Sequence, residues 1–259
     1  MQQMKKHTQQ LMATVFLLGG TQAFADCKPE TTSGPSLTSG GAIFYFDTTP
    51  INPEEQAIPS ERQLVLISKN CTSGEEKKID SMPFLAETGR IEEIFITKSP
   101  RKIFIIHKAE IRSDTGIPYS SAYYTILAYT PDGLNSSLDR DLTDYFSFGA
   151  DILENDNTKN IYTFPYKTKT SIENELKSKS FKTLTHKESL HATISRKTQI
   201  YNEPIITENR NSYLINGDKI LITKKQANWC NMNYETKKKK LISGWIFCSD
   251  LSISDQQTK

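Results

Sequence analysis

The chain has 259 residues, of which 36% are hydrophobic and 24% are charged, and its formal net charge is +2. This length suffices for two domains of ordinary size. A nearly neutral chain that is also exported, as the next features indicate, is not expected to bind nucleic acid. The charge is unevenly distributed, with 19 basic and 24 acidic side chains in residues 26–189 but 11 and 6 in residues 190–259. This split predicts different partners for the two halves, or attraction between them.

The first 25 residues have the three-part layout of a secretory signal peptide. A basic start precedes an apolar run from Leu11 to Leu18, and small residues end at Ala25. The run is well short of the ~20 residues that a membrane span needs, so no stable membrane anchor is expected. Lipidation of Cys27 is disfavoured, because Asp26 stands where the processing machinery requires a small residue. We predict cleavage after Ala25 and a periplasmic or secreted protein.

Four cysteines follow the predicted cleavage site, and an even number in an oxidising compartment indicates disulfides. Four cysteines allow three pairings, of which proximity in sequence favours Cys27–Cys71 and Cys230–Cys248. A metal site is disfavoured, because the chain has no Cys-x-x-Cys spacing and no histidine after residue 25 flanks a cysteine. We expect no metal, no cofactor and no thiol nucleophile.

Residues 26–185 are expected to form an antiparallel β-rich domain of no recognised family. A polar leader over residues 28–41 is rich in Gly, Ser, Thr and Pro and should be irregular. Strand-like runs rich in Ile, Val, Phe and Tyr follow, with Pro, Gly, Asn and Asp in the breaks. The expected strands are Ala42–Asp47, Arg62–Asn70, Ile91–Ser99, Arg101–Arg112 and Ser121–Thr130.

One short helix is predicted over residues 170–178. Thr170 is the expected N-cap and Glu173, three residues on, completes a capping box. Ile172 and Leu176 then share one face of the helix. The polar stretch Lys177–Ser189 lacks periodicity and is expected to hold the boundary between the two domains.

Residues 190–253 carry four short elements in a fixed order. They are a strand ending in Tyr-x-x-Pro, an apolar strand around Gly-Asp, a Trp-x-x-apolar-x-Tyr run, and Gly-Trp-apolar before an apolar end. The residues are Tyr201 and Pro204, Ile215–Ile220, Trp229 with Met232 and Tyr234, and Gly244–Ile246 with Leu251. This pattern resembles the bacterial Src-homology-3-like domain of exported proteins. The resemblance implies a small C-terminal β-barrel, so the fold class expected for the whole chain is mainly β.

Strand alternation separates two faces in this region. Cys230, Met232 and Tyr234 share one face, and Ile246 shares a face with Cys248, which brings the sulfurs together if both faces are core. The aromatic residues fall on the opposite side. The predicted binding residues are Tyr201, Trp229, Trp245 and Phe247. They could line a ligand groove, or pack against the first domain, and both alternatives stay open.

Other conspicuous residues are expected to be structural. Thr236–Lys240 should form the tip of a hairpin, either as a solvated loop or as a contact to an anionic partner. The acidic stretches Asp139–Asp144 and Asp151–Asn157 lack the order of a calcium loop. His107 lies in a strand and is expected to be structural or on the surface.

No motif for nucleophilic, phosphate-binding or zinc-dependent catalysis is present, so no catalytic residue and no enzyme is predicted. We expect a non-catalytic exported binding protein of the cell envelope. The family resemblance implies peptidoglycan peptide or an envelope protein segment as the partner. The alternative is an immunity or inhibitor protein that neutralises a secreted toxin or hydrolase, and a cell-wall hydrolase is the third possibility. Oligomeric state is left open.

Overall fold

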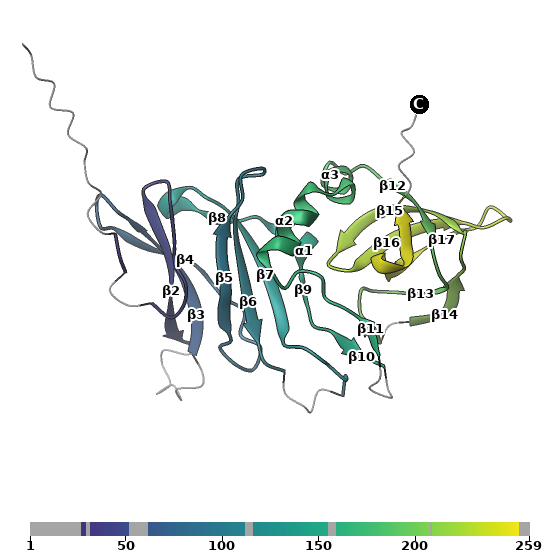
Figure 1. Ribbon diagram of the computed structural model, residues 1–259, viewed down its shortest axis with the longest axis horizontal. Coiled ribbons are helices and arrows are strands. Elements are labelled where there is room, and N and C mark those ends of the chain that lie inside the picture. The colour runs from purple at the N-terminus through teal and green to yellow at the C-terminus, as the bar shows by residue number, and fades with distance from the viewer. Residues whose placement is uncertain are drawn as a thin grey trace, which may run out of the picture.

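The computed structural model describes residues 27–29, 32–51, 62–111, 116–154, 159–207 and 209–253. The predicted signal peptide and its cleavage site lie outside the described residues. As predicted, the fold is mainly β with antiparallel sheets. Figure 1 shows two sheets of the first half on the left, three helices in the middle and the C-terminal sheet on the right.

The first sheet has the order β1-β2-β3-β4. Its strands are β1 (Leu37–Ser39), β2 (Ala42–Pro50), β3 (Arg62–Asn70) and β4 (Glu76–Ser81). The predicted disulfide is present, since Cys27 is bonded to Cys71 and thereby ties the segment before β1 to the end of β3. This bond anchors a leader that has little apolar surface of its own to bury.

The second sheet has the order β5-β6-β7-β8, with β9 also paired to β7. Its strands are β5 (Arg90–Ile96), β6 (Ile103–Ala109), β7 (Tyr123–Thr130), β8 (Ser137–Leu138) and β9 (Phe148–Gly149). Both faces of β6 are buried. Ile103 and Ile105 belong to the core shared with the first sheet, whereas Phe104 and Ile106 belong to the core on the other side. Burial on both faces explains the continuous apolar run of this strand.

Three short helices cover the outer face of the second sheet: α1 (Arg140–Phe146), α2 (Lys169–Lys177) and α3 (Lys179–Thr185). The predicted N-cap of α2 is wrong by two residues. Thr168, not Thr170, accepts the backbone N–H of Ser171, and Ser171 in place of Glu173 completes the capping box. Helix α2 therefore begins at Lys169, two residues before the start that an N-cap at Thr170 implies.

Helices α1 and α3 were not expected. Helix α1 occupies the acidic stretch, begins at the Asp139 cap and buries Leu142, Tyr145 and Phe146. Helix α3 occupies the stretch expected to hold the domain boundary and buries only Phe181 and Leu184. Each helix has seven residues, which is too short for periodicity to be read with certainty. Between α1 and α2 lies a two-stranded ribbon of β10 (Ile152–Leu153) and β11 (Asn160–Tyr162).

The C-terminal sheet has the order β14-β13-β17-β16-β15-β12-β18. Its strands are β12 (Leu190–Ile194), β13 (Thr198–Tyr201), β14 (Asn209–Leu214), β15 (Lys219–Gln226), β16 (Trp229–Glu235), β17 (Leu241–Phe247) and β18 (Leu251–Ile253). Only Ser195–Lys197 connect β12 to β13, although three strands separate these two in the sheet order. The sheet must therefore curl strongly. The hairpin predicted at Thr236–Lys240 joins β16 to β17.

The second predicted disulfide, Cys230–Cys248, links β16 to the short 3-10 helix η2 (Cys248–Asp250). Gly244, in the Gly-Trp pair, is required by a close approach of β13. A Cβ atom on Gly244 would lie 2.6 Å from Cγ2 of Ile200 and 2.9 Å from the carbonyl oxygen of Tyr201. The curl of the sheet thus explains the glycine of the motif.

The two halves of the chain share one hydrophobic core. A single cluster of buried side chains runs from the second sheet through α1–α3 into the C-terminal sheet. The turn between β15 and β16 reaches into the first half, where the Ala227 N–H donates to the Tyr145 carbonyl over 2.9 Å. Lys225 Nζ lies 2.7 Å from Glu175 Oε1, which also accepts the Tyr145 hydroxyl over 2.5 Å. This junction fixes the position of the C-terminal sheet relative to the helices.

Candidate functional site

The four aromatic residues predicted to bind a ligand are buried. Tyr201, Trp229, Trp245 and Phe247 are each at most 8% exposed. The ring centroids of Trp229 and Phe247 lie 4.6 Å apart, and those of Tyr201 and Trp229 lie 5.0 Å apart. Tyr162 from the first half stacks on Trp229 with centroids 5.6 Å apart. Trp229 and Phe247 therefore pack against the first half of the chain, which is the second of the two alternatives left open by the sequence.

We name Tyr162, Tyr201, Trp229 and Phe247 the closed aromatic group. Its members come from β11, β13, β16 and the end of β17, so it joins the ribbon of the first half to three strands of the C-terminal sheet. Burial raises the pKa of Tyr162 above its ordinary value. The group is a core, and its rings contribute apolar burial and edge or tilted ring contacts.

A second set of aromatic side chains lies beside the first and is partly open to solvent. We name Tyr119, Tyr123 and Phe148 the open aromatic group. The rings of Tyr123 and Phe148 stack with centroids 5.9 Å apart, and Tyr119 meets Tyr123 edge-on at 6.5 Å. Phe148 is 54% exposed. It is placed by β9, a two-residue strand that pairs with β7 through Thr125.

The open aromatic group lines a groove at the junction of the two halves, which we name the junction groove. Its volume is about 120 Å³, and Ile205, Ile206 and Trp229 line its other side. Ile205 is 51% exposed. Trp229 thus belongs to the closed aromatic group and also forms part of the groove wall. Of the four predicted binding residues, Tyr201, Trp245 and Phe247 do not line this groove.

The chemistry of the junction groove is apolar and uncharged. None of the described residues that line it is Asp, Glu, Lys, Arg or His. Burial, followed by the smaller effect of the neighbouring Tyr119, raises the pKa of Tyr123 to about 12. Burial also raises the pKa of Tyr119. Both hydroxyls are therefore neutral at neutral pH, so the groove can bury apolar groups and offer hydrogen bonds to a ligand.

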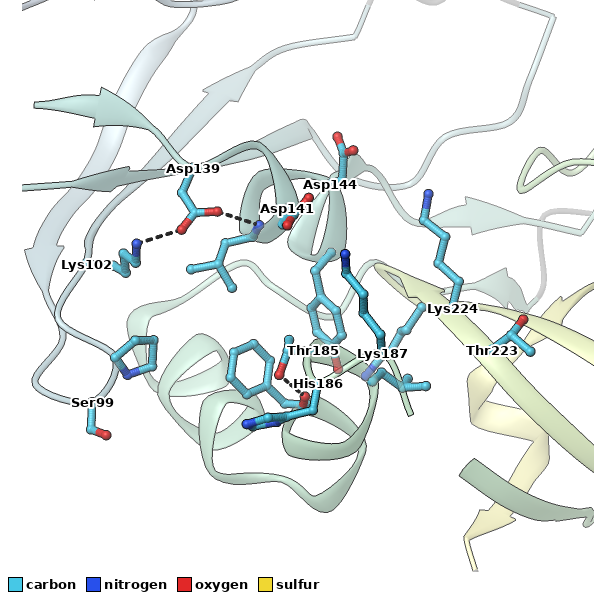
Figure 2. A pocket seen from close by; sticks show the side chains of 16 residues that line it. Ser99, Lys102, Asp139, Asp141, Asp144, Thr185, His186, Lys187, Thr223 and Lys224 are labelled. Carbon is cyan, nitrogen blue, oxygen red and sulfur yellow. Dashed lines mark hydrogen bonds and ion pairs between the residues drawn. The ribbon is translucent and has the colours of Figure 1, made fainter. Parts of the chain in front are cut away.

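A larger hollow of about 730 Å³ lies between α1, α3, β15 and the turn at Ser99–Pro100. Figure 2 shows it as a mixed-charge site, with Asp141 and Asp144 on α1 and Lys187 and Lys224 facing them. We name it the charged hollow. Its opening is lined by both signs of charge, so its electrostatic preference for one ligand charge is weak.

Asp139, at the edge of the charged hollow, is held by two partners. It lies 2.7 Å from Lys102 Nζ and accepts the Leu142 N–H over 3.1 Å, which caps α1. Figure 2 draws both contacts. The carboxylate therefore has a structural role at the start of the helix.

The other titratable residues considered from the sequence are structural where the chain is described. Among the described residues, no group of three or more His, Cys, Asp and Glu side chains could hold a metal ion. Asp151 pairs with Lys167 and accepts the Phe164 N–H, and the later residues 155–158 lie outside the described part. His107 is fully buried and its Nε2–H donates to the Thr88 carbonyl over 3.0 Å. Burial lowers the pKa of His107, so the ring is neutral.

Tyr119, Tyr123 and Phe148 were missed at the level of sequence. Their segments are dense in aromatic residues, "PYSSAYY" running into the start of β7 and "YFSFG" running from the end of α1 through β9. That density is a usable signal, but aromatic residues in strand-like runs are more often core. Only the fold shows that Phe148, on β9, is left exposed.

Comparisons with known proteins give no relative. No protein-family model, curated protein or solved structure matches this chain. Within the described residues, no helix is long and apolar enough to cross a membrane. The resemblance to the bacterial Src-homology-3-like domain therefore rests on the sequence pattern alone and stays a prediction.

Proposed function

We propose that this chain is a non-catalytic, exported binding protein of the cell envelope that holds a polypeptide segment in the junction groove. The observation that carries the proposal is the half-exposed ring of Phe148 beside Ile205, in a groove without charged side chains. Exposed apolar surface in a concave site is favourable to cover, and aromatic anchors give most binding energy at such sites. The partner is accordingly expected to insert an apolar side chain.

Export is supported by two independent features. The start of the chain has the layout of a signal peptide, and the structure holds two disulfides, whose bonded cysteines are separated by 44 and 18 positions in the sequence. Disulfides of this kind persist in oxidising compartments. We place the protein in the periplasm or outside the cell on these grounds.

The groove is composite, and this favours a protein partner over a wall peptide. The resemblance to the Src-homology-3-like family implies binding by the C-terminal barrel alone, through the aromatic face of that barrel. Tyr162 covers Trp229 on this face. The remaining opening needs Tyr123 and Phe148 from the first half as well. A surface built from both halves of the chain suits recognition of one folded or extended protein, as in an immunity or inhibitor protein.

The test uses the protein that begins at Asp26, with both disulfides formed. It is offered to purified peptidoglycan sacculi and, separately, to envelope extract. Phe148→Ala should reduce retention of the bound polypeptide by a hot-spot amount, about 2 kcal/mol. Leu241→Ala is the matched control, since Leu241 is exposed on β17 and lies outside the groove. Its binding should be unchanged.

Three results would contradict the proposal. Equal losses for Phe148→Ala and Leu241→Ala would show that the groove has no special role. If sacculi retain the Phe148→Ala variant as well as the original protein, binding occurs at another surface. Turnover of the wall polymer by the purified protein would show a hydrolase in place of a binding protein.

A further inference from the structure

A second groove, of about 670 Å³, lies on the other side of the turn at Ser99–Pro100 from the charged hollow. We name it the lysine groove. Its floor is apolar, and four lysine side chains surround that floor. The floor residues include Ile96, Leu176 and Phe181, and the lysines are Lys98, Lys169, Lys177 and Lys182.

The lysines come from three elements and are spaced apart. Lys98 lies in the turn after β5, Lys182 lies on α3, and Lys169 and Lys177 lie two turns apart on α2. Glu173, halfway between Lys169 and Lys177, is the acidic residue of the lining. Four positive charges therefore face one negative charge across a groove that is otherwise apolar.

The charges of the lysine groove are not neutralised by neighbours. None of its four lysines forms an ion pair with an acidic residue of the described chain, and Lys169 contacts the Phe95 ring at 5.5 Å. Two of the four lysines that line the adjoining charged hollow differ in this respect. Lys102 and Lys225 are paired with Asp139 and Glu175, each at 2.7 Å. The positive charge of the lysine groove remains available to a ligand.

The arrangement fits several separate negative charges better than one concentrated charge. Bidentate binding of a single phosphate uses an arginine fork, and a helix N-terminus can add its free N–H groups, whereas a lysine meets phosphate as a point charge. Here the cationic groups are lysines, and the start of α2 is closed by the Thr168–Ser171 capping box. A concave floor also suits a chain with protruding side chains better than a flat lipid surface.

We propose that the lysine groove binds an acidic polypeptide segment, in which Asp or Glu side chains alternate with apolar ones. The carboxylates pair with the lysines on the rim, and the apolar side chains cover Leu176 and Phe181 on the floor. This site is separate from the junction groove, and the inference does not depend on the function proposed for that groove.

The probe is a short fluorescent peptide in which Glu alternates with Leu, titrated with the protein beginning at Asp26 at low salt. Reversing Lys169, Lys177 and Lys182 to Glu together should weaken binding about tenfold. The control reverses Lys237, Lys238 and Lys240 to Glu in the hairpin tip, which changes the total charge equally. The control should change binding by about twofold or less.

Two further variants sharpen the test. Glu173→Gln removes the acidic side chain of the groove and should strengthen binding by about twofold. A peptide in which Glu alternates with Ser should bind more weakly than the Glu–Leu peptide, because it leaves the floor uncovered. Carbodiimide cross-linking of the bound peptide should map to lysines of the groove. Unfolding midpoints of all variants control for loss of structure.

The inference is overturned by any of four results. They are equal loss in the groove and hairpin-tip variants, equal binding of the two peptides, displacement of the peptide by inorganic phosphate at matched charge, and cross-links outside the groove. Anionic phosphatidylglycerol vesicles serve as a separate arm. If the protein binds these vesicles but not the peptide, and the groove variant loses vesicle binding, the ligand of the groove is lipid and the polypeptide is rejected.

Discussion

Two aromatic groups lie next to each other in this protein and differ in what covers them. The closed aromatic group, centred on Trp229 and Phe247, is sealed by Tyr162 from the first half. The open aromatic group has a comparable ring stack between Tyr123 and Phe148, but Phe148 is left half exposed. Both groups are built from aromatic side chains. The cover provided by the rest of the chain decides which group holds the protein together and which is free to bind.

The largest expected effect is on the closed aromatic group. Trp229→Ala should lower the free energy of unfolding by about 3 to 4 kcal/mol, because it removes a buried ring that three other rings contact. Denaturant unfolding measures this loss. Leu241→Ala on the exposed face should cost less than about 0.5 kcal/mol. Similar losses of unfolding free energy in the two variants would show that the closed aromatic group does not stabilise the fold more than an exposed side chain does.

A smaller effect is expected at the polar part of the junction. Glu175→Gln removes the charge that pairs with Lys225, where both side chains are mostly buried. We expect a loss of about 2 kcal/mol in the free energy of unfolding. Glu76→Gln is the control, because Glu76 pairs with Lys69 at the surface and should cost less than about 0.5 kcal/mol. If Glu76→Gln lowers the free energy of unfolding as much as Glu175→Gln does, the buried pair at the junction has no special role in stability.

A third effect, seen only at alkaline pH, concerns the open aromatic group. The folded-state pKa of Tyr123 is raised to about 12 by burial, above the ordinary value of 10.0. The unfolded chain therefore loses the proton first, so the stabilising contribution is full below pH 10 and falls as pH rises toward 12. The fall from this side chain is at most about 1.4 kcal/mol per pH unit.

Spectrophotometric titration of tyrosine checks this pH dependence. Tyr123→Phe should remove one late-titrating tyrosine and flatten the loss of stability at alkaline pH. A ligand in the junction groove should delay the titration of Tyr123 further. If the late part of the titration is unchanged in Tyr123→Phe, then Tyr123 is not shielded as described.

Much of the fold could be predicted from local pattern. Runs rich in Ile, Val, Phe and Tyr indicated the longer strands of the first half, though not β1 and β4, and proximity in sequence favoured the two disulfides that the structure contains. Helices α1 and α3 were not predicted, because a helix of seven residues shows too little hydrophobic periodicity to be recognised in the sequence. The capping box of α2 was misplaced because Thr168 and Thr170 are both good caps, and only the geometry selects Thr168. The division into two domains is not tested by these features and stays a prediction.

The candidate site was less predictable, since it depends on contacts between distant residues. Strand alternation correctly separated Trp229 and Phe247 from Met232, but it cannot tell which face another part of the chain will cover. Tyr162 covers Trp229 from a two-stranded ribbon far away in sequence. Likewise Phe148 is exposed because no other part of the described chain covers it, which tertiary structure decides.

The most direct test of the central claim replaces Phe148 by a photo-reactive phenylalanine and cross-links the protein in the intact envelope. The same replacement at Tyr213, which is exposed on β14, is the control. The account predicts a cross-link from position 148 to one polypeptide, and none of that product from position 213. Products of equal yield from both positions, or a glycan product at position 148, would contradict the assignment of the junction groove as a polypeptide-binding site.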